Sequence, residues 1–112
     1  MEVRAVSKYI HMAPQKVRLV ADLVRGVDVN SALEMLRLTP KEAAGAVRAT
    51  LASAVANAEE NYGLSPDELI VSTIMVDEGP TQRRYRAGAR GRYKPMLRRS
   101  SHITVIVSDR EA

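Results

Sequence analysis

The sequence has 112 residues, a length that suits one small domain and excludes a multi-domain enzyme. Apolar residues make up 46% of it and charged residues 27%, so the chain can form a core and is not a disordered polymer. It contains no cysteine, which excludes disulfides and thiol catalysis, and its charges interrupt every apolar stretch well before the roughly 20 residues of a membrane span.

A strand and a helix are predicted first along the chain. Residues Val3 to Met12 mix β-branched, aromatic and basic side chains and precede Pro14, which favours extended backbone before it. After Pro14, apolar residues recur at helical spacing until Gly26, a residue suited to a left-handed stop. The apolar positions of this first helix are Val17, Val20, Ala21, Leu23 and Val24.

A second helix of about two turns is expected to end near Leu38. Either Asp28 or Asn30 can cap its first turn, since both side chains accept hydrogen bonds from helix N–H groups. The residues that this helix is expected to direct into the core are Ala32, Leu33 and Leu36.

The third predicted helix is long. Thr39, Pro40 and Glu42 together indicate a capping box with a proline in the first turn, and Gly63 marks the end. Its apolar positions follow the helical period and are Ala43, Ala44, Val47, Leu51, Ala54, Val55 and Ala58. The alanine-rich face is interpreted as core in preference to a groove for a partner helix.

Two β-rich segments follow, separated by a long insertion. Leu69 to Val76 is nearly continuous in apolar character and predicts a central strand, and His102 to Val107 places Ile103, Val105 and Val107 on one face of another. If the two strands pair antiparallel, the residues between them form a long hairpin with its turn near 88–91. A limb of ten residues would reach roughly 30 Å from the body.

The positive charge is concentrated in this insertion. Between Thr81 and Arg99 there are eight bases and no acid, whereas the rest of the chain carries nine bases and thirteen acids. Such asymmetry favours a polyanionic partner over a merely solvated loop, because like charges repel one another unless an anion offsets them. The bases are Arg83, Arg84, Arg86, Arg90, Arg92, Lys94, Arg98 and Arg99.

The predominance of arginine points to phosphate, which guanidinium groups bind bidentately. Tyr85 and Tyr93 lie among these arginines, where they can stack on unpaired bases or pack across the hairpin, and the sequence does not separate the two. A second, weaker basic surface, or else a solvated face, is formed by Arg4, Lys8, Lys16, Arg18 and Arg25.

No catalytic or metal site is expected. Ser101 and His102 are adjacent in a strand, so their side chains point to opposite faces and do not make a nucleophile–base pair. His11 and His102, even with Asp77 and Glu78, lack a recognised ligand spacing. The glycines near residues 88–91 lack the lysine and hydroxyl of a phosphate-binding loop.

Five blocks of the sequence closely resemble the bacterial ribosomal protein L twenty-two family, in the family's order and spacing from about Val3 to Ser108. They are Lys16 to Gly26, Ala54 to Glu59, Val76 to Pro80, Ala89 to Arg92 and Ser101 to Val105. The resemblance implies an α+β fold with three helices packed on a three-stranded antiparallel sheet and a long protruding basic β-hairpin. It makes residues 1–112 one ribosomal protein domain, with an arm at about 79–99.

The resemblance also implies a cytoplasmic, non-enzymatic constituent of the large ribosomal subunit that needs no cofactor. Its expected partners are large-subunit ribosomal RNA, the L four family protein at the tunnel constriction and the nascent peptide. The RNA-binding residues are expected to be the eight bases of the arm together with Arg4, Lys8, Lys16 and Arg18. The hairpin tip, expected to face the exit tunnel, comprises Gly88, Ala89, Arg90 and Gly91.

Ala87, Gly88 and Tyr93 depart from residues common in that family, which affects the expected contacts of the tip. The alternative function is an architectural DNA-binding protein that clasps a duplex with a β-arm. Such arms wedge apolar tips into the minor groove, whereas small residues and arginine at this tip fit threading among RNA segments better.

Overall fold

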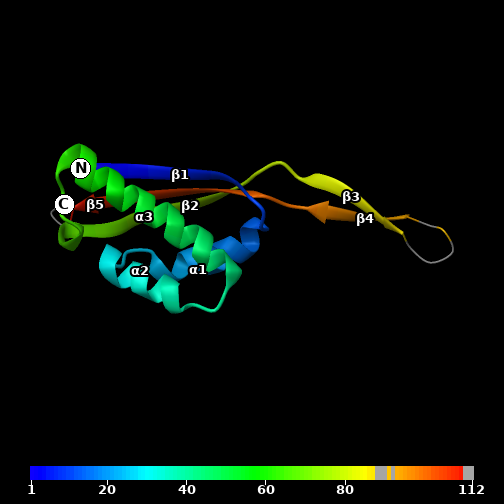
Figure 1. Ribbon diagram of the computed structural model, residues 1–112, viewed down its shortest axis with the longest axis horizontal. Coiled ribbons are helices and arrows are strands. Elements are labelled where there is room, and N and C mark those ends of the chain that lie inside the picture. The colour runs from blue at the N-terminus through cyan, green and yellow to red at the C-terminus, as the bar shows by residue number, and fades with distance from the viewer. Residues whose placement is uncertain (88–90, 92, 110–112) are drawn as a thin grey trace.

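The computed structural model describes residues 1–87, 91 and 93–109 (Figure 1). The elements in chain order are β1 (Glu2–Ile10), α1 (Pro14–Val24), α2 (Val29–Leu38), α3 (Glu42–Tyr62), the short 3₁₀ helix η1 (Pro66–Glu68), β2 (Leu69–Glu78), β3 (Gln82–Ala87), β4 (Tyr93–Arg98) and β5 (Ser101–Asp109). Within these described residues, three α-helices accompany an antiparallel sheet of three strands in the order β1-β5-β2. The predicted α+β class is confirmed.

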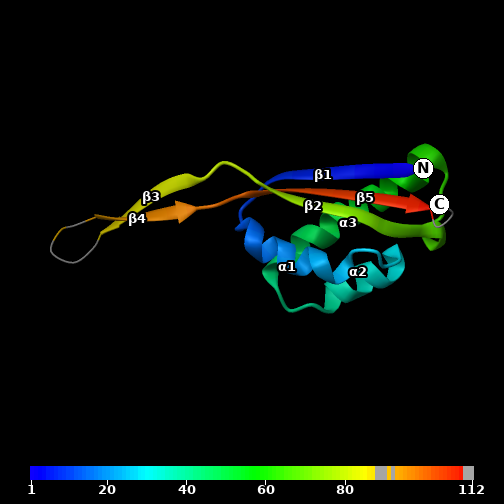
Figure 2. The same cartoon turned by 180° about the vertical axis from the view of Figure 1, so that it is seen from behind.

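The helices cover one face of the sheet. Helix α3 packs on β1 and β5, α1 packs on β2, and α2 packs against α3. Figure 2 shows β1 and β5 passing in front of α3, with no helix over their outer face. Strands β3 and β4 pair only with each other and project from one end of this body, which gives the molecule extents of 63 × 25 × 20 Å (Figure 1).

Local signals set the limits of the first two helices. Pro14 is the first residue of α1, and Gly26 follows the helix with a φ of +80°, as its position in the sequence predicted. Asp28 caps α2 by accepting a hydrogen bond from the Ser31 N–H, which decides between the two candidate caps. With 10 residues, α2 is nearly three turns long instead of two.

The predicted start of the third helix is wrong. Helix α3 begins at Glu42, and its N-cap residue, Lys41, makes no side-chain capping bond. Thr39 instead ends the helix before it, because its hydroxyl donates to the Met35 carbonyl at 2.6 Å and its N–H bonds to Leu36. The end of α3 is as predicted, with Gly63 in the left-handed conformation at a φ of +65°.

Strand β2 lies at an edge of the sheet, so the prediction of a central strand is wrong. The chain between α1 and α2 covers this edge: the Gly26 N–H donates to the Val71 carbonyl and the Val71 N–H donates to the Val27 carbonyl, each at 2.8 Å. The apolar character of β2 comes from Leu69, Val71, Ile74 and Val76, which are buried in the core although the strand lies at the edge. The central strand is β5, which pairs with both β1 and β2.

The core lies between the helices and the sheet, and aliphatic side chains and alanine fill it. All seven apolar positions predicted for α3 are buried, which confirms the interpretation of its alanine face as core. Ile103, Val105 and Val107 of β5 are fully buried beneath them, as the alternating pattern predicted. Leu23 is an exception, since α1 leaves it 47% exposed.

Replacing a core leucine tests the packing of α3 on the sheet. Leu51→Ala should lower the free energy of unfolding by about 2–5 kcal/mol, because the side chain is fully buried and its removal leaves a cavity. Urea denaturation followed by far-UV circular dichroism measures the change. The matched control is Leu38→Ala, which removes the same atoms from a side chain that is 68% exposed and should cost less than about 0.5 kcal/mol. Equal losses in the two variants would contradict the assigned core.

Candidate nucleic-acid interface

The arm, residues 79–99, is joined to the central strand of the sheet by a short set of hydrogen bonds. Pairing of β2 with β5 extends to Glu78 and Ser101, and the Gly79 N–H then donates to the Ser100 carbonyl at 2.9 Å. The Ser100 hydroxyl donates to the Pro80 carbonyl at 2.7 Å. The base of the arm is therefore fixed on both of its limbs.

Gly79 permits this close approach. A Cβ atom at this position would lie 2.5 Å from the Ser100 hydroxyl and 3.2 Å from a ring carbon of His102. A side chain at position 79 would therefore displace the Ser100 hydroxyl from its hydrogen bond to Pro80 or push the two limbs apart.

The register of β3 and β4 places like charges opposite each other. Arg86 pairs with Lys94 in this register, and Arg84 precedes Arg86 by two residues on β3. Directly opposed cations destabilise a strand pair. Salt bridges between described residues join Met1 to Asp109, Arg25 to Asp22 and Arg37 to Glu34, and none of them involves Arg83, Arg98 or Arg99.

The structure places the predicted arm residues as follows. Arg83, Arg84 and Arg86 lie on β3, Lys94 and Arg98 lie on β4, and Arg99 follows β4 directly. The side chains of Arg83, Arg98 and Arg99 are exposed. In the register, Tyr85 pairs with Pro95 and Tyr93 pairs with Ala87. Stacking on bases and packing across the ribbon both remain predictions for these tyrosines.

The predicted tip falls almost entirely outside the described residues, which exclude Gly88, Ala89, Arg90 and Arg92. Gly91 is described and has a φ of +74°, a left-handed conformation that glycine adopts without strain. A tunnel-facing role for these residues therefore stays a prediction.

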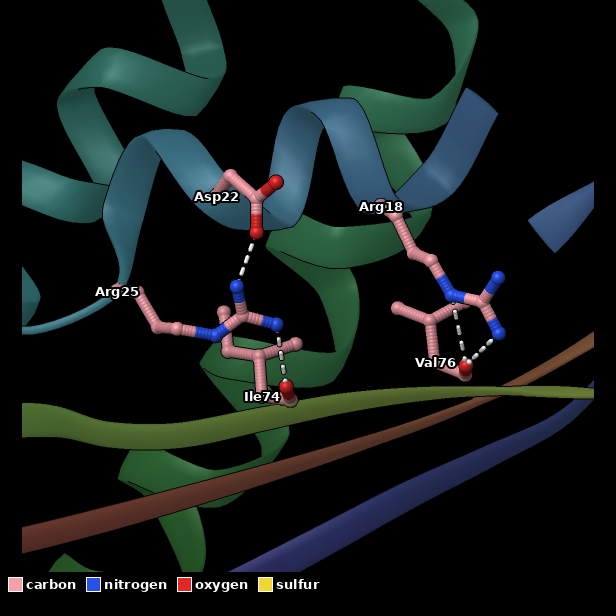
Figure 3. A network of polar contacts seen from close by, with 5 residues as sticks. All are labelled: Arg18, Asp22, Arg25, Ile74 and Val76. Carbon is pink, nitrogen blue, oxygen red and sulfur yellow. Dashed lines mark hydrogen bonds and ion pairs between the residues drawn. The ribbon is translucent and has the colours of Figure 1, made fainter. Parts of the chain in front are cut away.

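The second basic surface is divided among three places. Lys16 lines a groove beside the arm, while Arg4 and Lys8 are exposed on β1. Arg18 donates twice to the Val76 carbonyl, at 2.9 and 3.2 Å, and Arg25 donates to the Ile74 carbonyl at 2.8 Å while pairing with Asp22 (Figure 3). Arg18 and Arg25 thus satisfy carbonyl groups on the outer edge of β2. RNA binding by Arg4, Lys8, Lys16 and Arg18 stays a prediction.

A groove of about 1160 Å³ lies where the arm meets the body. It is bounded by the end of β1, the first turns of α1 and α3, and the base of the arm. Its charged lining residues are Lys16, Lys41, Glu42, Arg98 and Arg99. We call this feature the basal groove.

Tyr9 and Lys41 also line the basal groove, although the sequence did not single them out as functional residues. No local sequence pattern indicates a role for Lys41, because it meets residues 98 and 99 at the groove only in the folded chain. Tyr9 has a φ of +58° in an irregular stretch of β1, a feature that the β-rich pattern around it does not reveal.

The Ser100–Ser101–His102 segment has structural contacts. The Ser101 hydroxyl donates to the Met12 carbonyl at 2.7 Å, and the Nδ1 atom of His102 accepts a hydrogen bond from the Tyr9 N–H at 3.1 Å. Among the described residues, no group of three or more histidine, cysteine or acidic side chains is arranged to hold a metal ion. In the same part of the chain, no helix combines the length and the apolar character that crossing a membrane requires.

A body that carries a projecting arginine-rich ribbon, with a cationic groove at its base, is typical of proteins that bind nucleic acid. Residues 5–108 match the family model described as "Ribosomal protein L22p/L17e". The chain belongs to this family, as its sequence motifs indicated.

Three curated relatives carry the name "Large ribosomal subunit protein uL22". The protein of Herpetosiphon aurantiacus is 53% identical over 111 residues, which cover 99% of this chain and 98% of the relative. That of Thermoanaerobacter sp. (strain X514) is 49% identical over 111 residues, covering 99% of this chain and all of the relative. That of Magnetococcus marinus is 54% identical over 106 residues, covering 95% and 94% of the two chains.

Two glycine-to-alanine substitutions test the close contact at the base of the arm. Gly79→Ala should destabilise the protein by about 1–3 kcal/mol, because its new methyl group overlaps the Ser100 hydroxyl. Gly45→Ala adds the same methyl group within α3, where nothing lies within 4 Å, and should stabilise the protein by about 0.5–1 kcal/mol. Thermal and urea unfolding measure both changes, and shifts of the same sign would argue against the proposed contact.

Proposed function

We propose that the chain binds large-subunit ribosomal RNA through its arm and basal groove, assists assembly of that RNA and extends the arm to the wall of the nascent-peptide exit tunnel. As a member of its family, it is a structural protein of the large ribosomal subunit in the cytoplasm and not an enzyme. The L four family protein and the nascent peptide are its proposed neighbours at the tip.

The projection of a uniformly cationic arm carries this proposal. From Thr81 to Arg99 the arm contains no carboxylate, and its strands β3 and β4 project from one end of the body (Figure 1). Phosphate groups would neutralise its charges and reduce the repulsion between opposed residues such as Arg86 and Lys94. Arginine suits this role because its guanidinium group binds phosphate bidentately and stacks on bases.

Binding to ribosomal RNA should depend steeply on salt. If all eight arm cations contact phosphates, the slope of log K against log salt is about −6, or roughly a thousandfold loss of affinity from 50 to 200 mM salt. The double variant Arg83→Gln/Arg98→Gln should make that slope shallower by about 1.4, since two phosphate contacts are lost. Filter binding to a large-subunit RNA transcript over a salt series measures the slope.

The matched control is Arg37→Gln/Arg48→Gln, which removes two exposed charges from the outer surfaces of α2 and α3. The control should keep the original slope. Undiminished binding after deletion of residues 83–92 would contradict the role of the arm. Preference for duplex DNA over ribosomal RNA at equal salt would instead favour the architectural DNA-binding alternative.

A further inference from the structure

The basal groove has the dimensions and charge of a site for an extended anion. Its volume of about 1160 Å³ exceeds the roughly 300–1,000 Å³ of common small-molecule pockets. Four bases and the carboxylate of Glu42 line it, and His11 adds a further polar group. The bases are Lys16 at the start of α1, Lys41 before α3, and Arg98 and Arg99 at the end of β4.

Tyr9 presents an exposed aromatic ring at this groove because β1 bulges there. Ser7 pairs with Ile103 and Ile10 pairs with Ser101, so Lys8 and Tyr9 together oppose the single residue His102. Tyr9 takes a φ of +58°, which is costly for a bulky side chain, and residues strained in this way cluster at functional sites. Bulges of this kind redirect a side chain relative to the sheet.

Contacts with His102 hold Tyr9 in place without covering it. The Tyr9 N–H donates to His102 Nδ1 at 3.1 Å, and the two rings meet edge to face with centroids 5.0 Å apart. The tyrosine is nevertheless 59% exposed. A strained residue that served only to fill the core would be buried, so the bulge is better explained by a ligand that contacts the ring.

We propose that the basal groove binds a single-stranded segment of RNA, with one unpaired base stacked on Tyr9 and flanking phosphates on Lys16, Lys41, Arg98 and Arg99. The inference rests on the proposed function, which it deepens by naming a base-stacking residue in the body. A stacking ring amid cations is typical of single-strand recognition, because a base within a duplex has no free face. The excess of bases over acids favours RNA over a protein partner.

The test uses the full-length protein with two RNA probes, a single-stranded dodecauridylate and the same strand annealed to dodecaadenylate. Tyr9→Gly removes the ring and also suits the positive φ, so this variant should fold as well as the unaltered protein. Its affinity for the single strand should fall about five- to a hundredfold, whereas its affinity for the duplex should stay within twofold. Tyr9→Phe should retain both affinities.

Salt dependence separates stacking from phosphate binding. Tyr9→Gly should leave the salt slope of single-strand binding unchanged, because it removes no phosphate contact, whereas Lys41→Gln should make it shallower by about 0.7. Tyr62→Ala is the matched control, because it removes a ring that is 52% exposed at the far end of α3. This control should bind both probes like the unaltered protein.

Three results would overturn the inference: no binding of the single strand by the unaltered protein, unchanged single-strand affinity in Tyr9→Gly, or equal losses on both probes. If Tyr9→Gly binds normally while Arg83→Gln, which alters the arm but not the lining of the groove, still weakens binding to ribosomal RNA, the stacking site in the groove is refuted and the RNA-binding role of the arm stands. If the unaltered protein binds neither the ribosomal transcript nor the single strand, both fail together.

Discussion

The pairing of β5 on both of its edges is the interaction on which the rest of the structure depends. Strand β5 joins β1 to β2, buries the apolar side chains of Ile103, Val105 and Val107, and continues at its N-terminal end into the arm. The hydrogen bond from Gly79 to Ser100 follows directly after the last pair of the β2–β5 ladder. The same strand that organises the core therefore fixes where the arm leaves the body.

Arginine has two distinct uses in this molecule, and the difference lies in the available partners. Arg18 and Arg25 project from α1 onto the edge of β2, where backbone carbonyl groups accept their hydrogen bonds. They act with the Gly26–Val71 pairing to close an edge that would otherwise be open to another strand. The arginines of the arm, in contrast, lie in a segment that contains no acidic residue to pair with them. Composition alone does not separate these uses, since both groups lie in basic stretches of sequence.

The features predicted correctly from the sequence are those with local causes. Proline at the start of α1, glycine after α3 and the alternation in β5 each act within a few residues of their effect. The errors arose where one residue or pattern is compatible with two structures. Thr39 can cap the helix after it or end the helix before it, and in the structure its hydroxyl and N–H both bond to carbonyl groups of α2. The apolar run of β2 reflects the burial of Leu69, Val71, Ile74 and Val76 in the core, which an edge strand can provide as well as a central one.

The same contrast between local sequence patterns and contacts between distant parts of the chain applies to the candidate site. The charges of the arm are evident from the sequence, because eight bases stand together without an acid. The basal groove is assembled from three separate parts of the chain, and the bulge at Tyr9 depends on pairing with a strand more than 90 residues away.

An isolated two-stranded ribbon is marginally stable in water, and the eight bases of this arm have no acid in their own segment to offset their charge. A polyanion that bound the arm alone would reduce the repulsion but leave the arm's orientation to the few contacts at its base. An RNA that also occupied the basal groove would bridge arm and body, so that binding at one would strengthen binding at the other.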